Sequence, residues 1–481
     1  MNEKNFKLAE QYIPKTYVCQ GQDAIHRREN LMNDLLSHRK IPEVGWDDQT
    51  IEYILSQLSL MDSNNFYGNT GVGEREGRIL SGMVARRHFY LAHGIGRAGD
   101  VQAYQPKAAG SSLIVQLTRT LAIDYLHFYG LTEIKDCLVL PLATGMSITL
   151  VLLTLKKCRP QAKYVIWPRV DQKTCLKAII TAGFIPIVVE NILVGDELQT
   201  DTETYESLVN SYAPEEVACI MGTTSVFAPK DPDNISFISQ LGKEKNIPVV
   251  INNAYGLQAT STCKLINKCI QNYRVDAIIS STDKNLMVPV GGALIYSNNK
   301  EFINQIQTHY PGRASMSPVL DVFITFLTAG KNQLIELRKQ REELYPYMYS
   351  KLVETVSSIN ESILVTPNNP ISIGITLDHL PGDITKFGGM LYTRGVSGSR
   401  CVGMSGNKVI GGITFENYGS HSNHYPHQYM TAACAIGLNK NDVDVFIERF
   451  LKTIKQYKKD ELKKELKKKE QTDNTEIIQE Q

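Results

Sequence analysis

The chain has 481 residues, 42% of them apolar, and a formal net charge of +1. This length is enough to bury one large hydrophobic core or two. The near-zero charge excludes a whole-molecule field that attracts nucleic acid, so any such site must be a local patch. No stretch approaches the roughly 20 apolar residues that a membrane-spanning helix needs, so we expect no membrane association.

The first 60 residues are predicted to be helical. Apolar residues fall at helical spacing over residues 26–38 and again over 51–58, after the capping residue Asp47. Residues 1–45 then form an extension ahead of the main domain. Two interpretations stay open for it, an oligomerisation arm and a plain packing helix.

Residues 61–112 carry two glycine-rich loops with arginine, at 71–78 and 93–100. Glycine lets backbone N–H groups approach a phosphate, and a guanidinium binds it through two hydrogen bonds. Neither loop has Walker or Rossmann spacing, which argues against an ATPase and a nicotinamide dehydrogenase. The alternatives are an anion site and ordinary surface turns.

From residue 113 onward helices and strands alternate. Helices are predicted over 111–126 and 148–155, and strands over 137–142, 164–167, 185–189, 217–220, 248–252, 277–279 and 293–296. Polar residues recur at the carboxyl ends of these strands, where open α/β sheets place their sites. We therefore expect residues 46–310 to form a doubly wound α/β domain. Thr144 and Gly145, at a strand-to-helix turn, offer N–H groups to a phosphate.

Lys284 lies in a polar turn between two of these strands. Residues 277–279 form a short buried strand, and Gly291 and Gly292 lead into the next one. Partial desolvation in such a turn lowers an amine's pKa and makes it nucleophilic, which suits it to hold a carbonyl cofactor as a Schiff base. The alternative is a loop lysine that only caps a strand end.

The order of these features resembles that of pyridoxal-phosphate enzymes of the aspartate aminotransferase fold. A phosphate-binding turn is followed by a strand ending at Asn252, and Lys284 follows about thirty residues later. In that fold the middle position is normally an aspartate that keeps the pyridine nitrogen protonated. Because a neutral amide holds that proton less firmly, we expect transamination to be disfavoured and β-elimination to be retained.

Residues 311–455 are predicted to form a smaller α+β domain, with helices over 320–329 and 333–352 and strands over 363–366 and 371–376. His421, His424 and His427 have no carboxylate at matching spacing, so we expect no metal site. Residues 456–481 form a Lys-rich tail, since residues 452–470 hold nine lysines against four acids. This stretch is either a frayed, solvated helix or a basic strip that contacts RNA phosphates.

Two features predict a cytoplasmic protein. The sequence Met-Asn-Glu-Lys-Asn-Phe-Lys at the start contains no apolar run of the signal-peptide kind. The nine cysteines are scattered without a Cys-x-x-Cys motif, which indicates reduced thiols rather than disulfides or zinc ligands.

Eight short motifs together resemble one family, the O-phosphoseryl-tRNA(Sec) selenium transferases, also called selenocysteine synthases of archaea and eukaryotes. The motifs are Gly-Val-Gly-Glu-Arg-Glu-Gly-Arg, His-Gly-Ile-Gly-Arg, Gln-Pro-Lys-Ala-Ala-Gly-Ser-Ser, Ala-Thr-Gly-Met-Ser, Trp-Pro-Arg-Val-Asp-Gln-Lys, Asn-Asn-Ala-Tyr-Gly, Asp-Lys-Asn and Tyr-Pro-Gly-Arg-Ala-Ser. The resemblance covers residues 62 to about 440. It implies an aspartate-aminotransferase-like (fold type I) transferase fold with a mostly parallel sheet, a helical N-terminal extension and a smaller α+β C-terminal domain.

The resemblance also implies roles for individual residues. Lys284 is the implied Schiff-base lysine for pyridoxal 5'-phosphate, and the other implied cofactor contacts are Arg75, Ala143, Thr144, Gly145, Gln172 and Asn252. The implied phosphate site of the substrate consists of Arg97, Ala98, Gln105 and Arg313. Glu74 is implied to repel a free α-carboxylate, so that only the esterified aminoacyl-tRNA is accepted. The implied tRNA contacts are Gln271, Arg400 and Lys463.

Two positions depart from the family pattern. Animal members have serine where this chain has Ala98, so one hydrogen bond to the phosphate is missing, a loss of about 1 kcal/mol unless water replaces it. Gln271 stands where a tRNA-contacting arginine is usual.

The implied reaction converts O-phosphoseryl-tRNA(Sec) into selenocysteinyl-tRNA(Sec) with selenophosphate, by elimination of phosphate and addition of selenium. The family forms homotetramers, dimers of close dimers. Two alternatives stay open: a pyridoxal-phosphate lyase or desulfurase on free amino acids, and a catalytically silent tRNA-binding scaffold.

Overall fold

A computed structural model describes residues 1–404 and 406–479, with side chains up to residue 467. A mixed seven-stranded sheet forms its centre, in the order β1-β9-β8-β7-β6-β2-β3. The strands are β1 (Asp136–Leu140), β2 (Tyr164–Pro168), β3 (Ile185–Val189), β6 (Val217–Thr223), β7 (Val249–Asn252), β8 (Ala277–Ser281) and β9 (Ala293–Ser297). The pairs among β3, β2, β6, β7 and β8 are parallel, and β9 runs antiparallel to both β8 and β1. The middle strands are buried throughout, which explains their continuous apolar sequences.

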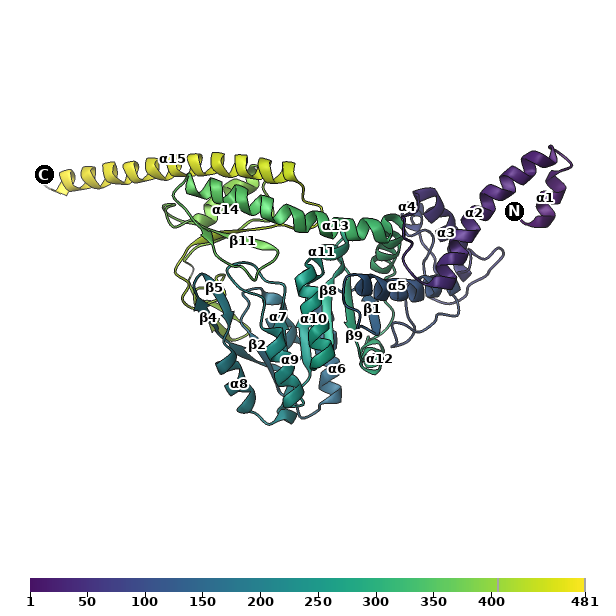
Figure 1. The fold of residues 1–481 in the computed structure, drawn as a ribbon, viewed down its shortest axis with the longest axis horizontal. Coiled ribbons are helices and arrows are strands. Elements are labelled where there is room, and N and C mark those ends of the chain that lie inside the picture. The colour runs from purple at the N-terminus through teal and green to yellow at the C-terminus, as the bar shows by residue number, and fades with distance from the viewer. Residues whose placement is uncertain (405, 480–481) are drawn as a thin grey trace.

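Two groups of helices pack on this sheet (Figure 1). One contains α6 (Thr144–Cys158), α7 (Lys173–Thr181) and α12 (Lys300–Thr308), and the other contains α8 (Thr202–Asn210), α9 (Ile235–Glu244) and α10 (Thr260–Asn272). The helix α5 (Ala109–Phe128) packs on β1 at the sheet edge. Short 3-10 helices cover Ser63–Asn65, Pro214–Glu216 and Gly256–Gln258.

The N-terminal helices α1 (Glu3–Ala9) and α2 (Lys15–His38) project from the body, whereas α3 (Asp48–Ser59) packs on α5 (Figure 1). The segment between α2 and α3 is hydrogen-bonded to the long helix α13 (Ser317–Ser357), where Trp46 N–H donates to the Leu327 carbonyl at 2.8 Å. A Cβ on Gly330 would lie 2.5 Å from the backbone nitrogen of Gly45. Glycine at 330 therefore permits this close approach.

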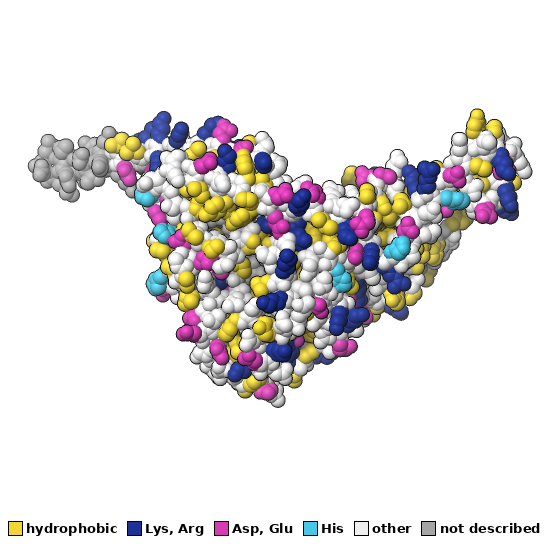
Figure 2. All heavy atoms as spheres, in the orientation of Figure 1, with side chains coloured by type: hydrophobic (Ala, Val, Ile, Leu, Met, Phe, Trp, Pro, Cys, Tyr) yellow, Lys and Arg dark blue, Asp and Glu magenta, His cyan; other side chains and the backbone are white. Residues whose placement is uncertain are grey.

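The smaller C-terminal part has a four-stranded sheet in the order β10-β11-β15-β12. Its strands are β10 (Ile363–Leu364), β11 (Ser372–Thr376), β15 (Tyr429–Ala433) and β12 (Arg400–Val402), and a hairpin of β13 (Lys408–Ile410) and β14 (Ile413–Phe415) stands apart. The second half of α13, α14 (Ile384–Thr393) and α15 (Lys440–Gln479) enclose a second hydrophobic core with this sheet. The helix α15 extends beyond the body at the end opposite the N-terminal helices, and Figure 2 shows Lys and Arg side chains over its described part.

Most predicted elements are present, with different ends. Gly330 has non-helical backbone angles (φ 63°, ψ 174°), so α13 is interrupted where the sequence predicted a break between two helices. The helix α6 begins at Thr144 rather than Ile148, because the polar Thr-Gly turn is itself the first helical turn. The predicted strand over 363–366 is limited to two residues, and the predicted frayed tail is a continuous helix through residue 479.

Several elements had no counterpart in the prediction. They are the hairpin β4 (Asn191–Val194) and β5 (Glu197–Thr200), the helices α4 (Gly82–Arg87) and α14, and the strands β12 to β15. Across the described residues, none of the helices combines the length and apolar character that a bilayer crossing requires.

Candidate active site

Lys284 lies on the five-residue helix α11 (Thr282–Leu286), directly after β8 at the carboxyl edge of the sheet. Its carbonyl accepts a hydrogen bond from Gln258 Nε2 at 2.6 Å, and the neighbouring Asn285 Nδ2 donates to the carbonyls of Ala254 and Ser281 at 2.8 and 2.7 Å. The backbone of Lys284 is therefore fixed, whereas its amine forms no hydrogen bond or ion pair with the described residues. Its Nζ lies 5.6 Å from the centre of the Tyr255 ring.

The sequence predicted partial desolvation of this amine, and the single chain does not show it. Lys284 is exposed, although its amine approaches the ring of Tyr255. Tyr255 is buried, and its hydroxyl has no hydrogen-bond partner among the described residues.

The first turn of α6, the start of α7 and the end of β7 supply the other predicted cofactor residues except Arg75. Ala143 caps α6 without a side-chain hydrogen bond, so the N–H groups at Thr144 and Gly145 face no capping acceptor. Gln172 is the N-cap residue of α7. Asn252 is the last residue of β7 and is 5% exposed, and its Oδ1 is buried without a partner in the described chain.

The loop 71–78 is folded on its own side chains. The Arg78 guanidinium donates to the carbonyls of Gly71 and Gly73, the latter at 3.0 Å. Glu76 forms an ion pair of 2.5 Å with Lys107, and a Cβ on Gly73 would lie 2.4 Å from its carboxylate. This packing leaves Glu74 and Arg75 exposed on the outside of the loop.

The loop after His93 makes a tight turn in which Arg97 and Asp100 exchange backbone hydrogen bonds of 2.8 and 2.9 Å. Ala98 and Gly99 occupy its centre with φ values of 36° and 89°, the left-handed region. Farther along, Gln105 Oε1 accepts a hydrogen bond of 3.4 Å from Lys107 N–H, and Gln105 Nε2 donates to no residue in the described part of the chain. The Arg97 side chain is exposed and makes no ion pair within the described chain.

Arg313 is held beside this loop by a two-bond bridge between Ile95 and Ala314, with N–O distances of 3.0 and 3.1 Å. Its Nε and Nη2 atoms are buried and have no hydrogen-bond partner among the described residues. Partial burial, and next the positive charge of Arg75, lowers the pKa of the Arg313 guanidinium. An unpaired, partly desolvated guanidinium beside a second arginine is the arrangement expected of an anion site.

A buried ion pair in the segment before Gln172 is hydrogen-bonded to the C-terminal part. Arg169 binds Asp171 through Nε and Nη2 at 2.9 and 3.1 Å, and Asp171 Oδ2 also accepts the N–H groups of Gly419 and His421. The imidazole Nδ1 of His421 accepts the Asp171 N–H at 2.8 Å. These bonds fix the position of the loop that leads to Gln172.

The predicted tRNA contacts lie apart from one another. Arg400 begins β12 and donates to the Gly419 carbonyl at 2.9 Å, whereas Gln271 is exposed on α10 and donates to Glu133 at 3.0 Å. Lys463 is exposed on α15. His427 contacts Asp378 at 2.6 Å. In the described part of the chain, His421, His424 and His427 belong to no cluster of three or more side chains that could bind a metal.

The structure thus forms two separate groups from the predicted residues. In one, the charges of Arg75 and Arg313 interact, and the Ile95–Ala314 bridge places Arg313 beside the loop that carries Arg97. In the other, Lys284, Thr144, Gln172 and Asn252 lie at the carboxyl edge of the sheet. No hydrogen bond, ion pair or ring contact joins Lys284 to Arg97 or Arg313 within residues 1–404 and 406–479.

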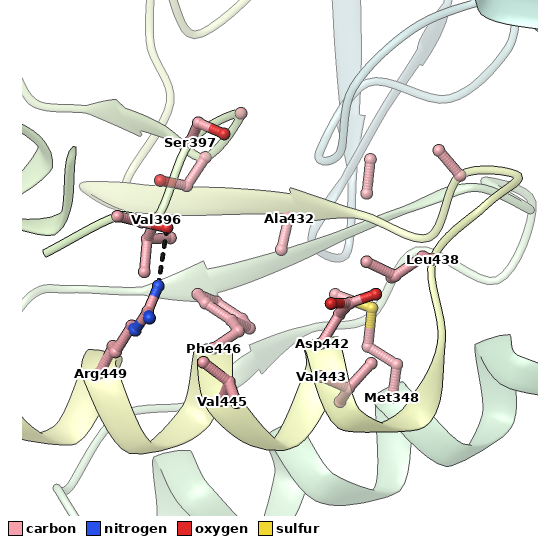
Figure 3. A pocket seen from close by; sticks show the side chains of 15 residues that line it. Met348, Val396, Ser397, Ala432, Leu438, Asp442, Val443, Val445, Phe446 and Arg449 are labelled. Carbon is pink, nitrogen blue, oxygen red and sulfur yellow. Dashed lines mark hydrogen bonds between the residues drawn. The ribbon is translucent and has the colours of Figure 1, made fainter. Parts of the chain in front are cut away.

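A pocket of about 430 Å³ lies elsewhere, between the loop 395–399 and α15 (Figure 3). Arg449 closes one end of it by donating to the Gly395 carbonyl at 2.9 Å, and Phe446 and Ala432 contribute apolar surface. None of the predicted cofactor or phosphate residues lines this pocket.

Sequence reasoning missed Tyr255 and Cys175. Tyr255 stood inside the Asn-Asn-Ala-Tyr-Gly motif, so its place after β7 was visible, but the approach of its ring to Lys284 was not. Cys175 follows Gln172 by three residues, and it gave no signal as one of nine scattered cysteines.

The fold first defines a class of protein. The chain is similar to the crystal structure of Oryza sativa TDC with PLP and tryptamine, with a TM-score of 0.54 at 13% identity over 90% of this chain and 98% of the other. A likeness at this identity concerns the fold alone, and that fold is the fold type I architecture of pyridoxal-phosphate enzymes. The predicted fold class is confirmed.

Closer comparisons identify the family. The model of the family described as O-phosphoseryl-tRNA(Sec) selenium transferase matches residues 61–455. The Dictyostelium discoideum O-phosphoseryl-tRNA(Sec) selenium transferase is 46% identical over 94% of this chain and 99% of its own length. An archaeal O-phosphoseryl-tRNA(Sec) selenium transferase crystal structure is 30% identical, with a TM-score of 0.85 over 92% of this chain and 98% of that one.

The chain belongs to the O-phosphoseryl-tRNA(Sec) selenium transferase family. It is an enzyme of selenocysteine biosynthesis that acts on tRNA and converts O-phosphoseryl-tRNA(Sec) into selenocysteinyl-tRNA(Sec). The predicted family and reaction are confirmed, and the silent scaffold and the free-amino-acid lyase are not supported.

Proposed function

We propose that the chain carries out this conversion with pyridoxal 5'-phosphate bound to Lys284 and with selenophosphate as the selenium donor. The residues at the carboxyl edge of the sheet fit the cofactor. Asn252 presents a buried Oδ1 without a partner in the described chain, and the uncapped first turn of α6 offers N–H groups to a phosphate. Lys284 has a free amine on a fixed backbone. Gln172 and the exposed Arg75 complete the proposed cofactor contacts.

When bound, the cofactor supplies an electron sink at the seryl Cα. The Lys284 amine, once released, takes the Cα proton as general base. Arg97, Gln105 and Arg313 hold the phosphate while the Cβ–O bond breaks, and phosphate leaves with the bonding electrons to give dehydroalanyl-tRNA. Selenophosphate then occupies the same anion site, and its selenium adds at Cβ while the Lys284 ammonium returns a proton to Cα. Hydrolysis of the Se–P bond releases a second phosphate and gives selenocysteinyl-tRNA.

The observation that carries this proposal is the Arg313 guanidinium. Two of its nitrogens are buried without a partner among the described residues, although an unpaired buried cation is costly. A phosphate oxyanion supplies the missing acceptors, and Arg75 adds a second positive charge nearby. In this proposal one anion site serves both the departing phosphate and the incoming selenophosphate.

Selection of the substrate is proposed to depend on Glu74, which is exposed beside Arg75. A free α-carboxylate meets a like charge there, whereas the ester of an aminoacyl-tRNA does not. Arg400 and Lys463 are proposed tRNA contacts. Gln271 donates a hydrogen bond to Glu133, so its proposed contact with the tRNA is weaker than that of the arginine usual in the family.

The assembly is proposed to be a homotetramer whose active sites are shared between copies. The exposure of Lys284, and its lack of a contact with Arg313 in the described single chain, support sites completed by a second copy. Leu8 and Tyr17 on the projecting helices and Tyr12 in the turn between them are exposed, which supports a role for residues 1–45 in assembly. The chain is proposed to divide into domains 46–310 and 311–455, with the tail 456–481 beyond. The two hydrophobic cores support two domains, but along α13 the first core continues to Leu334 and the second begins at Leu344, which favours a boundary within this helix. Nine unpaired cysteines support a cytoplasmic location.

The test is incubation of the purified protein with O-phosphoseryl-tRNA(Sec) and selenophosphate, with phosphate release and selenium incorporation measured together. Both are expected with the full chain. When selenophosphate is omitted, we expect phosphate release without selenium incorporation. This result separates the elimination from the addition. Selenium incorporation without release of the phosphate carried by O-phosphoserine would contradict the order of steps.

A further inference from the structure

The Asn252 amide is oriented by a thiol. Its Nδ2 donates a hydrogen bond to Sγ of Cys175 at 3.1 Å, and both side chains are buried, with exposed fractions of 5% and 3%. Cys175 belongs to the first turn of α7, which follows Gln172, whereas Asn252 ends β7. One sulfur thus connects the helix that begins at Gln172 to the strand that carries the proposed partner of the cofactor ring.

The other end of the same amide has no partner. Asn252 Oδ1 is buried and accepts no hydrogen bond from any described residue. A buried carbonyl oxygen in this state needs a donor from outside the chain. Because Nδ2 is engaged by the sulfur, the amide presents its oxygen, an acceptor, to the proposed cofactor position.

The side chains next to the thiol, those of Asn252, Thr223 and Trp167, are neutral. Burial, with a smaller contribution from the charge of the Asp233 carboxylate, raises the pKa of the Cys175 thiol to about 11, so it stays protonated at neutral pH. The sulfur therefore accepts from Nδ2 as a weak, uncharged acceptor. No charged group is among the partners that form hydrogen bonds with Asn252 in the described structure.

We propose that Cys175 is a positioning residue that holds the Asn252 oxygen toward the bound cofactor, so that the cofactor's ring nitrogen donates to it and carries a proton. This inference rests on the proposed function, since it requires the cofactor. It deepens that proposal, because an amide held as an acceptor favours the protonated ring even without an aspartate. An amide free to rotate would present Nδ2 equally well and would favour the unprotonated ring.

The test is ¹⁵N NMR of the full-length protein loaded with pyridoxal 5'-phosphate labelled at the ring nitrogen. The wild type is expected to give one resonance at the upfield position of a protonated ring. Cys175→Ala removes the acceptor for Nδ2, and its resonance is expected to move downfield toward the unprotonated position. Cys175→Ser keeps an acceptor and is expected to return the resonance toward that of the wild type.

Cys219→Ala is the matched control, because Cys219 is fully buried in β6 and has no contact with Asn252 among the described hydrogen bonds. Its resonance is expected to equal that of the wild type. A merely structural role of Cys175 would lower stability and leave the ¹⁵N position unchanged. In turnover, Cys175→Ala is expected to lower kcat with KM for the aminoacyl-tRNA unchanged.

Two results would overturn the inference: an unprotonated ring in the wild type, or the same resonance in the wild type and Cys175→Ala. The wild-type spectrum alone decides the first, even if Cys175→Ala does not fold. A wild type that binds no cofactor at all, with no visible absorbance, would instead contradict the proposed function.

Discussion

The backbone N–H of Asp171 donates a hydrogen bond of 2.8 Å to Nδ1 of His421, a residue 250 positions later in the chain. Asp171 Oδ2 accepts the His421 N–H in return, also at 2.8 Å. His421 is fully buried with a φ of 69°, and Asn191 donates to its carbonyl. The imidazole therefore belongs to a fixed joint between the two parts of the molecule.

This joint predicts loss of stability in acid. Burial, the largest cause, lowers the pKa of His421 to about 3 from the ordinary 6.5. As the pH falls, the imidazole of the unfolded chain is protonated near pH 6.5, whereas the imidazole of the folded chain stays neutral down to about pH 3. The folded state therefore has its full stability above about pH 6.5 and loses stability between pH 6.5 and pH 3. At pH 5 the free energy of unfolding is therefore expected to be about 2 kcal/mol lower than at pH 6.5, because each pH unit corresponds to about 1.4 kcal/mol. Urea unfolding at pH 7 and pH 5 measures it.

His421→Asn is the variant for this measurement, because asparagine tolerates a positive φ and keeps an acceptor near Nδ1. Its free energy of unfolding is expected to depend less on pH, by about one proton. Equal pH dependence in the wild type and His421→Asn would show that the buried imidazole is not the titrating group.

Arg313→Gln is expected to lower kcat/KM for O-phosphoseryl-tRNA(Sec) by about 100-fold, since hydrogen bonds from a charged donor contribute about 3 kcal/mol. Arg313→Lys keeps the charge without the two-pronged geometry and is expected to fall between the wild type and Arg313→Gln. Inhibition by inorganic phosphate gives an independent measure of the same site. Equal inhibition of the wild type and Arg313→Gln would place the anion elsewhere.

Substitution of Ala98 tests the contribution of the serine hydroxyl that animal members of the family have at this position. Ala98→Ser is expected to lower the inhibition constant of inorganic phosphate about fivefold, the equivalent of one hydrogen bond of about 1 kcal/mol. Ala98→Gly is the control for the backbone, because glycine suits the φ of 36° without adding a donor. The same tightening in both variants would attribute the effect to the turn rather than to the hydroxyl.

Glu74→Gln is expected to permit phosphate release from free phosphoserine, because the like-charge repulsion of the α-carboxylate is removed. Glu76→Gln is the matched control two residues away. Glu76 pairs with Lys107, whose hydrogen bond lowers its pKa, so its charge is already balanced. Free phosphoserine that reacts with neither variant would exclude Glu74 as the selecting group.

The sequence predicted most of the fold and the local parts of the site, because these depend on neighbouring residues. The buried strands, the Thr144-Gly145 turn and the lysine after β8 each follow from a short motif and its spacing. The break at Gly330 was also visible as the gap between two amphipathic helices.

The remainder depends on contacts between distant segments. No local pattern indicates that Cys175 binds Asn252, or that the segment before Gln172 is bound by the loop at His421. Partial burial of Lys284 was predicted from its polar turn, yet its exposure depends on which distant segments pack over the edge of the sheet. The residues near 284 in the sequence do not specify those segments.

The central claim is that a covalent aldehyde cofactor resides on Lys284. Borohydride reduction of the purified protein followed by peptide mass mapping measures this directly. A pyridoxyl phosphate group is expected on Lys284, with no label in Lys284→Ala. Label on a different lysine, or visible cofactor absorbance retained by Lys284→Ala, would contradict the account.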